Sequence, residues 1–141
     1  MNAAQTEAKR WFRQAKADIA VVQTLKSAGH YAATCFHSQQ VAEKALKALL
    51  YSQGSRVVLG HSVRELAKQC EAYAPEFANF ATEAALLDQF YIPTRYPNGL
   101  PSPAVPDETY TDTQAATAQQ AAEDILTLVE TFLRTHTQAL D

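Results

Sequence analysis

Hydrophobic residues recur at spacings of three and four along most of the chain, which is the period of an amphipathic α-helix. The first such stretch has these apolar positions: Ala8, Trp11, Phe12, Ala15, Ile19, Val22 and Leu25. Gly29 follows it, and a glycine that tolerates positive φ is typical just beyond a helix end. The second stretch runs from Tyr31 to about Ser52. The pattern therefore predicts two long helices in the first part of the chain.

Two helix-start signals predict the next elements. Ser62 and Glu65 have the spacing of a capping box, which opens a short helix to about Ala72. Pro75 suits the first turn of a longer helix near Glu76 to Phe90, because the missing proline N–H has no helical partner there. A third and a fourth helix are therefore expected in the middle of the chain.

A proline-rich segment separates these helices from the last one. Five of the six prolines lie within residues 91–110, so this segment is predicted to be a long, semi-rigid loop. Thr111 then forms a capping-box pattern with Gln114 and begins a helix that runs to about Thr137. No alternating pattern of strand length is present. The expected fold is all-α, an antiparallel up-and-down bundle of four long helices and one short helix.

Composition narrows the class of protein. The 141 residues, 47% of them hydrophobic, suffice for one domain over residues 1–141. The four glycines stand far apart, which excludes the glycine-rich phosphate loops of Rossmann and P-loop domains. Two cysteines cannot form a CxxC-type zinc site, so neither a metal nor a cofactor is expected. With no signal peptide and no bilayer-spanning run, we expect a cytoplasmic protein without a membrane partner.

Charge is distributed unevenly along the chain. Residues 1–70 carry ten Lys and Arg against four Asp and Glu, whereas residues 71–141 carry two against eleven. The formal net charge of −3 therefore conceals a basic half and an acidic half. Such asymmetry is typical of proteins with charged partners, although antiparallel packing would use part of it between the two halves.

Three polar residues lie on or beside the apolar faces of the first two helices. Gln39 and Glu43 belong to the second helix and Asp18 to the first. A buried carboxylate is costly unless it is paired, so each needs a partner, for which Arg95, His61 or a main-chain N–H are candidates. The result is either a structural network that fixes helix register or the floor of a polar pocket.

A second polar cluster lies on the flank of the same helix, at spacings of three and four: His37, Gln40, Lys44 and Lys47. Three cations of the first helix would adjoin it in an antiparallel pair: Arg10, Arg13 and Lys16. Such a cluster could bind a phosphate or another anion. A solvated helix face would carry the same residue types.

Arg95 lies between Tyr91 and Tyr96 inside the proline-rich loop. The planar guanidinium suits bidentate recognition of phosphate or carboxylate, and the tyrosine rings can stack on bases or on the arginine itself. A second arrangement, which need not exclude the first, has Arg95 fold back to pair with Glu43 or with an acidic residue of the preceding helix. The predicted ligand-binding set is therefore Lys44, Lys47, His37, Arg95 and Tyr96.

Four segments resemble the HEPN domain family in their order and spacing. These are A-x-x-D-I at 15–19, the Q-Q-V-A-E-K-A-L-K-A run at 39–48, the segment that begins at His61, and T-R-Y-P at 94–97. The resemblance covers the chain from about Ala8 to the final helix. It implies an antiparallel bundle of four to five helices, usually a homodimer, which in small members often pairs with a minimal nucleotidyltransferase encoded alongside.

Many HEPN proteins are metal-independent endoribonucleases, and the resemblance implies an R-x4-6-H motif on a late helix for that activity. The motif is not found there. His136 is the only histidine after residue 61, and Arg134 is too close to it. The one formal match is Arg56 with His61, in the loop before the third helix.

We therefore expect a non-catalytic, dimeric HEPN protein. It would bind a nucleotide or an RNA phosphate and assemble with a minimal nucleotidyltransferase, as in a toxin–antitoxin pair. Alanine-rich helices in so small a bundle leave apolar surface to cover, which also favours a homodimer. One alternative is a metal-independent endoribonuclease toxin that uses Arg56 and His61. The other is a purely structural helical adaptor.

Overall fold

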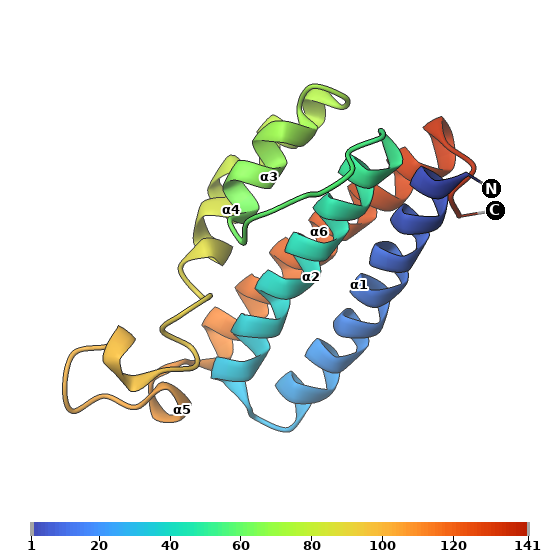
Figure 1. Ribbon diagram of the computed structural model, residues 1–141. Helices are drawn as coiled ribbons and strands as arrows, with labels where there is room; N and C mark the ends of the chain where they lie inside the picture. Colours follow the sequence, from blue (N-terminus) through green and yellow to red (C-terminus); the bar gives the residue numbers. More distant parts are fainter. Residues whose placement is uncertain (1, 141) are drawn as a thin grey trace.

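The computed structural model describes residues 2–140, and every regular element in that range is helical. Three long helices form its body: α1 (Ala3–Ser27), α2 (Tyr31–Ser52) and α6 (Asp112–His136). α1 runs antiparallel to its neighbours α2 and α6, as Figure 1 shows. The predicted all-α bundle is confirmed. Within residues 2–140, no helix combines the length and the apolar content that crossing a bilayer requires.

Local signals explain where the long helices begin and end. The predicted capping box at Thr111 is present, since its side chain accepts from the Gln114 N–H and the Gln114 side chain accepts from the Thr111 N–H. Asn2 and Gln5 form the same motif at α1. Gly29 has a φ of 82°, as predicted for the residue that ends the first helix.

The short helix α3 (Val63–Cys70) begins with a cap that comes partly from another helix. The Ser62 side chain accepts from the Glu65 N–H, as predicted. The return bond expected from the Ser62 N–H to the Glu65 side chain is not among the described contacts. Instead, Asp88 accepts from the Val63 N–H at 2.6 Å and from the Ser62 hydroxyl at 2.7 Å. A carboxylate suits a helix N-terminus, because the first N–H groups there lack helical partners.

The fourth predicted helix is divided in two. Its first turns form a 3₁₀ helix, η1 (Pro75–Phe80), and only α4 (Ala81–Asp88) is α-helical. 3₁₀ turns are frequent at the start of α-helices. The proline-rich loop also holds two short helical pieces, η2 (Pro97–Gly99) and α5 (Pro106–Thr109), each of which begins with a proline. Proline is compatible with a first helical turn, so it starts these pieces instead of preventing them.

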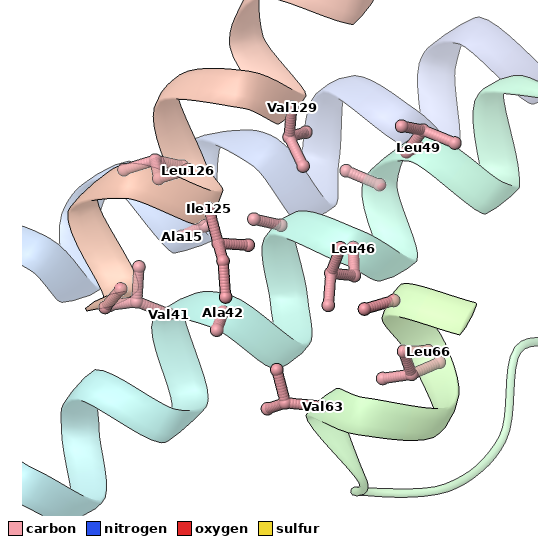
Figure 2. Close-up of a cluster of buried hydrophobic side chains, with 14 of the residues drawn as sticks. Ala15, Val41, Ala42, Leu46, Leu49, Val63, Leu66, Ile125, Leu126 and Val129 are labelled. Atoms are coloured by element: carbon pink, nitrogen blue, oxygen red, sulfur yellow. The ribbon is translucent and has the colours of Figure 1, made fainter. Parts of the chain in front are cut away.

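The core surrounds α2, which packs against α1, α3 and α6. Figure 2 shows aliphatic side chains of α2, α3 and α6 meeting in one cluster, with Ala15 of α1 beside them. Many of the fully buried core positions are alanines: Ala8, Ala15, Ala42, Ala45, Ala48, Ala84, Ala115, Ala118 and Ala122. Small side chains let helix axes approach closely. This close packing places the side chains of α2 directly against polar groups of its neighbours.

Both cysteines are expected to resist alkylation in the folded protein. Cys35 and Cys70 are free and fully buried, and burial raises the pKa of each thiol to about 12. The thiolate is the reactive form, so iodoacetamide at pH 8 should leave both unmodified until denaturant is added, when mass spectrometry should count two adducts. Rapid modification of either one in the folded protein would contradict the burial described.

Candidate functional site

A buried carboxylate organises one face of α2. The Glu43 and Lys47 side chains are 5% and 6% exposed, and the Lys47 ammonium lies 3.2 Å from Glu43 Oε2. Gln39 donates to Glu43 Oε1 at 3.2 Å and to the main-chain oxygen of His61 at 2.8 Å. The same Oε1 lies 3.1 Å from Nδ1 of the His61 ring. Gln39, Glu43 and His61, which the sequence placed in one polar network, are therefore in direct contact.

His61 is held against Glu43 and Tyr91 although most of its side chain is exposed. Its side chain is 58% exposed, and its ring stacks on Tyr91 with centroids 4.8 Å apart. A carboxylate only accepts hydrogen bonds, so Nδ1 carries the proton toward Glu43. In the neutral ring, Nε2 is then a hydrogen-bond acceptor. Glu43 thus fixes both the tautomer and the orientation of His61.

Arg95 lies on an aromatic surface that we call the Arg95 shelf: Phe36, Tyr91 and Tyr96. Its guanidinium carbon is 4.3, 4.7 and 5.0 Å from the three ring centroids, respectively. Nε donates to the Tyr91 carbonyl at 2.8 Å. Within residues 2–140, neither terminal nitrogen of Arg95 has a hydrogen bond or an ion pair. The predicted stacking on the tyrosines is confirmed, and the alternative in which Arg95 pairs with Glu43 is wrong.

An open depression of about 460 Å³ lies beside the Arg95 shelf. Phe36, His37, Thr94 and Arg95 are among its lining residues, and Asp107 contributes one carboxylate. Burial lowers the pKa of His37, an effect that Asp18 opposes and Lys44 reinforces. His37 is consequently neutral at neutral pH, where it can donate or accept a hydrogen bond.

The lysines of the predicted ligand-binding set are already paired. Lys47 is buried beneath Trp11, with its ammonium 5.4 Å from the ring centroid, and is not on a solvated flank. Lys44 forms an ion pair with Asp18, to which Gln14 also donates at 2.8 Å. Asp18 therefore belongs to a separate pair, outside the network of Glu43. Anion binding by the two lysines stays a prediction.

Arg56 and His61, the formal nuclease match, share no hydrogen bond or ion pair in the part of the chain that the structure describes, and a nuclease site made of these two residues stays a prediction. Arg56 lies exposed in the segment that joins α2 to α3, which runs in an extended path beside α2 in Figure 1. An extended chain advances about 3.3 Å per residue, so Arg56 is carried away from His61. No hydrogen bond or ion pair involves Arg56 in the described part of the chain. His61 faces Glu43 and Tyr91 instead.

The half-buried His37 predicts a pH effect on stability. Its pKa is lowered from the ordinary 6.5, so just below pH 6.5 the unfolded chain binds a proton that the folded protein does not. Stability should therefore fall as the pH drops through that window. Urea unfolding between pH 5.5 and 7.5 measures the effect. The free energy of unfolding should fall less steeply with decreasing pH in His37→Gln than in wild type, and the exposed control His30→Gln should behave as wild type. An equal or steeper fall in His37→Gln would contradict this.

The sequence profile of the HEPN domain matches residues 8–135, a range that includes every residue of the site described above. The chain belongs to the HEPN domain family. A relative from Methanocaldococcus jannaschii, named "Putative toxin MJ1304", is 28% identical over 134 residues, covering 90% of this chain and 88% of the relative.

Two solved structures share the HEPN fold with this chain. TT1696 from Thermus thermophilus is 36% identical, with a TM-score of 0.79 over 89% of this chain and 98% of its own. The archaeal HEPN homologue ST0689 is 35% identical, with a TM-score of 0.73 over 89% of this chain and 96% of its own. Both similarities extend over most of the bundle that carries the Arg95 shelf.

Two residues of the site were not predicted from the sequence. Phe36 forms part of the Arg95 shelf although it lies on α2, far from Arg95 in sequence. Gln14 supports Asp18 one turn away on α1. The spacing of Gln14 and Asp18 was a usable signal, because residues four apart on a helix are neighbours. Phe36 gave no such local signal, since only tertiary packing brings it under Arg95.

Proposed function

We propose that this HEPN protein is a non-catalytic module that binds the phosphate of a nucleotide or of RNA at the Arg95 shelf. The observation that carries the proposal is the guanidinium held over Phe36, Tyr91 and Tyr96 with its two terminal nitrogens uncommitted in the described structure. A planar, oriented guanidinium matches two phosphate oxygens at once.

The surroundings of Arg95 favour a nucleotide over a simple carboxylate. Tyr96 is half exposed and His61 exposes its ring beside Tyr91, so flat surfaces are available for stacking a base. His37 adds a neutral hydrogen-bonding group to the same depression. The negative charge of Asp107 opposes an anion at one edge of the depression, so we expect the phosphate on the side of Arg95.

The proposal also includes a homodimer and a protein partner. The protein would form a symmetric homodimer. It would also bind a minimal nucleotidyltransferase, as in a cytoplasmic toxin–antitoxin-like pair, and both contacts would cover apolar surface that is exposed in the monomer. Val57 and Leu59 support this, because they are 69% and 79% exposed on the segment between α2 and α3. The name of the Methanocaldococcus relative supports a toxin-like setting.

The test compares a nucleoside monophosphate with its parent nucleoside by titration calorimetry at low salt. Saturable binding of the monophosphate, with little binding of the nucleoside, is the expected result, because the charge on phosphate provides the main contact. Saturable binding of neither ligand would leave a purely structural adaptor as the better description. Equal affinity for the monophosphate and the nucleoside would mean that the phosphate is not bound, and would contradict a phosphate site at Arg95.

A metal-independent endoribonuclease toxin is a second candidate function. Two observations support it. The buried Glu43 orients the His61 ring, and both His61 and Arg95 pack on the ring of Tyr91, with the guanidinium carbon of Arg95 4.7 Å from the ring centroid. An oriented imidazole can transfer protons, and a guanidinium can hold the scissile phosphate. Arg95, and not Arg56, would then be the phosphate-holding residue. Cleavage of RNA in EDTA that His61→Ala abolishes and Arg56→Ala preserves would establish this alternative.

A further inference from the structure

A second depression, of about 620 Å³, lies between α1 and α2. Three cations line it, Arg10, Arg13 and Lys44, against one carboxylate, Glu7. Trp11, half-buried, forms part of its wall. The excess of positive charge makes this depression suitable for an anion, whereas no step of the proposed function uses it.

The cations of this depression differ in how strongly they are engaged. Arg10 is 72% exposed and pairs with Glu7 at 2.9 Å, a kind of surface pair that contributes little and exchanges readily. Arg13 is exposed and has no ion pair within residues 2–140. Lys44 is held by Asp18. Arg13 is therefore the cation most available to a ligand, with Arg10 beside it.

Each of the two depressions is lined by at least one residue of α2. His37 lines the depression beside the Arg95 shelf, and Lys44 lines the one on α1. They are seven residues apart, which is two helical turns on the same face and a rise of about 10 Å. Both Lys44 and its partner Asp18 act on the pKa of His37, so these side chains lie close together. We call the surface formed by Arg95, His37, Lys44, Arg13 and Arg10 the basic track.

We propose that a single-stranded RNA segment occupies the whole basic track, with one phosphate at Arg95 and a later phosphate at Arg13 and Arg10. This inference rests on the proposed function and names the ligand as a strand instead of a mononucleotide. One phosphate group cannot reach both ends of a surface longer than about 10 Å. Arginine forks and exposed aromatic rings fit phosphates and unpaired bases, whereas an acidic protein would use the charge alone.

The test measures binding of a fluorescent oligouridylate of about 12 nucleotides by anisotropy across a range of salt concentrations. UMP binding is measured by calorimetry on the same proteins. Four proteins are compared: wild type, Arg13→Ala, Arg95→Ala and the control Lys68→Ala, which removes one exposed cation from α3. All three changes are at exposed positions. Circular dichroism verifies that each variant is folded.

Arg13→Ala is expected to weaken oligouridylate binding several-fold at low salt. It should also reduce the slope of log K against log salt by about 0.7, the value for one phosphate contact on a single strand. UMP binding should stay unchanged in Arg13→Ala and be lost in Arg95→Ala. Lys68→Ala should behave as wild type in both assays.

Three outcomes would overturn a proposal, and they are distinguishable. Unchanged oligouridylate affinity and salt slope in Arg13→Ala, with UMP binding still dependent on Arg95, would overturn the basic track alone. Displacement of the oligonucleotide by polyglutamate as efficiently as by unlabelled RNA would assign the track to an acidic protein. If wild type does not bind UMP, or if Arg95→Ala binds it equally well, the proposed function itself fails.

Discussion

Replacing Glu43 with alanine is expected to lower the free energy of unfolding by about 3 to 5 kcal/mol. The Lys47 ammonium beside it is almost completely buried, and Glu43 is the carboxylate with which it pairs. Removal of Glu43 leaves that charge in the core without compensation. The change also removes the acceptor of Gln39 and of the His61 ring. Urea unfolding followed by circular dichroism measures the effect.

Two controls distinguish the effect of an unpaired buried charge on stability from the effect of lost packing. Replacing both Glu43 and Lys47 with leucine removes both charges together and should recover much of the lost stability, because hydrophobic replacement of a buried pair is often nearly neutral. Arg134→Ala breaks a pair of the same i,i+4 spacing with Glu130 on the surface, and should cost less than about 1 kcal/mol. An equally small effect for Glu43→Ala would contradict a buried, paired Lys47.

Arg95→Ala is expected to weaken nucleotide binding by about 10- to 100-fold. This range corresponds to a charge-assisted hydrogen bond of about 1.5 to 3 kcal/mol. Arg95→Lys should fall between wild type and alanine, because lysine keeps the charge but loses the planar fork and the stacking on Phe36 and Tyr91. Titration calorimetry with a nucleoside monophosphate at low salt measures all three proteins.

The expected loss is specific to binding. Arg95 is exposed and its hydrogen bond is to a carbonyl of its own loop, so the alanine variant should lose less than about 1 kcal/mol of stability. A variant that binds as tightly as wild type would remove Arg95 from the site. Equal affinity of the lysine and alanine variants would mean that the positive charge alone contributes nothing, and that the contact depends on the planar fork of arginine or on its stacking.

The helices that were predicted well carry their signals locally. The apolar periods of α1, α2 and α6 follow directly from sequence, as do the glycine at the end of α1 and the cap of α6. The division between η1 and α4 carries no such signal, since the residues on both sides of it are compatible with a helix. The contribution of Asp88 to the cap of α3 depends on tertiary packing, which the local pattern does not contain.

The polar residues show the same limit. A helical wheel identified Gln39 and Glu43 as polar residues on an apolar face, and His61 was among the candidate partners found. The wheel could not place Lys47, because the cation lies beneath Trp11 of a neighbouring helix. The sequence left open whether Arg95 stacks on the tyrosines of its own loop, pairs with Glu43 or an acidic residue of the preceding helix, or does both. In the structure Arg95 packs on Tyr91 and Tyr96, because the stiff loop keeps it beside them.

One measurement tests non-catalytic binding most directly: a labelled single-stranded RNA is incubated with the protein in EDTA at low salt, and its bound fraction and its length are read from the same sample. Saturable binding of RNA that stays intact, weakened by Arg95→Ala and unchanged by Lys68→Ala, is the result we predict. RNA that is shortened by wild type and left intact by His61→Ala would contradict it, as would RNA that stays unbound.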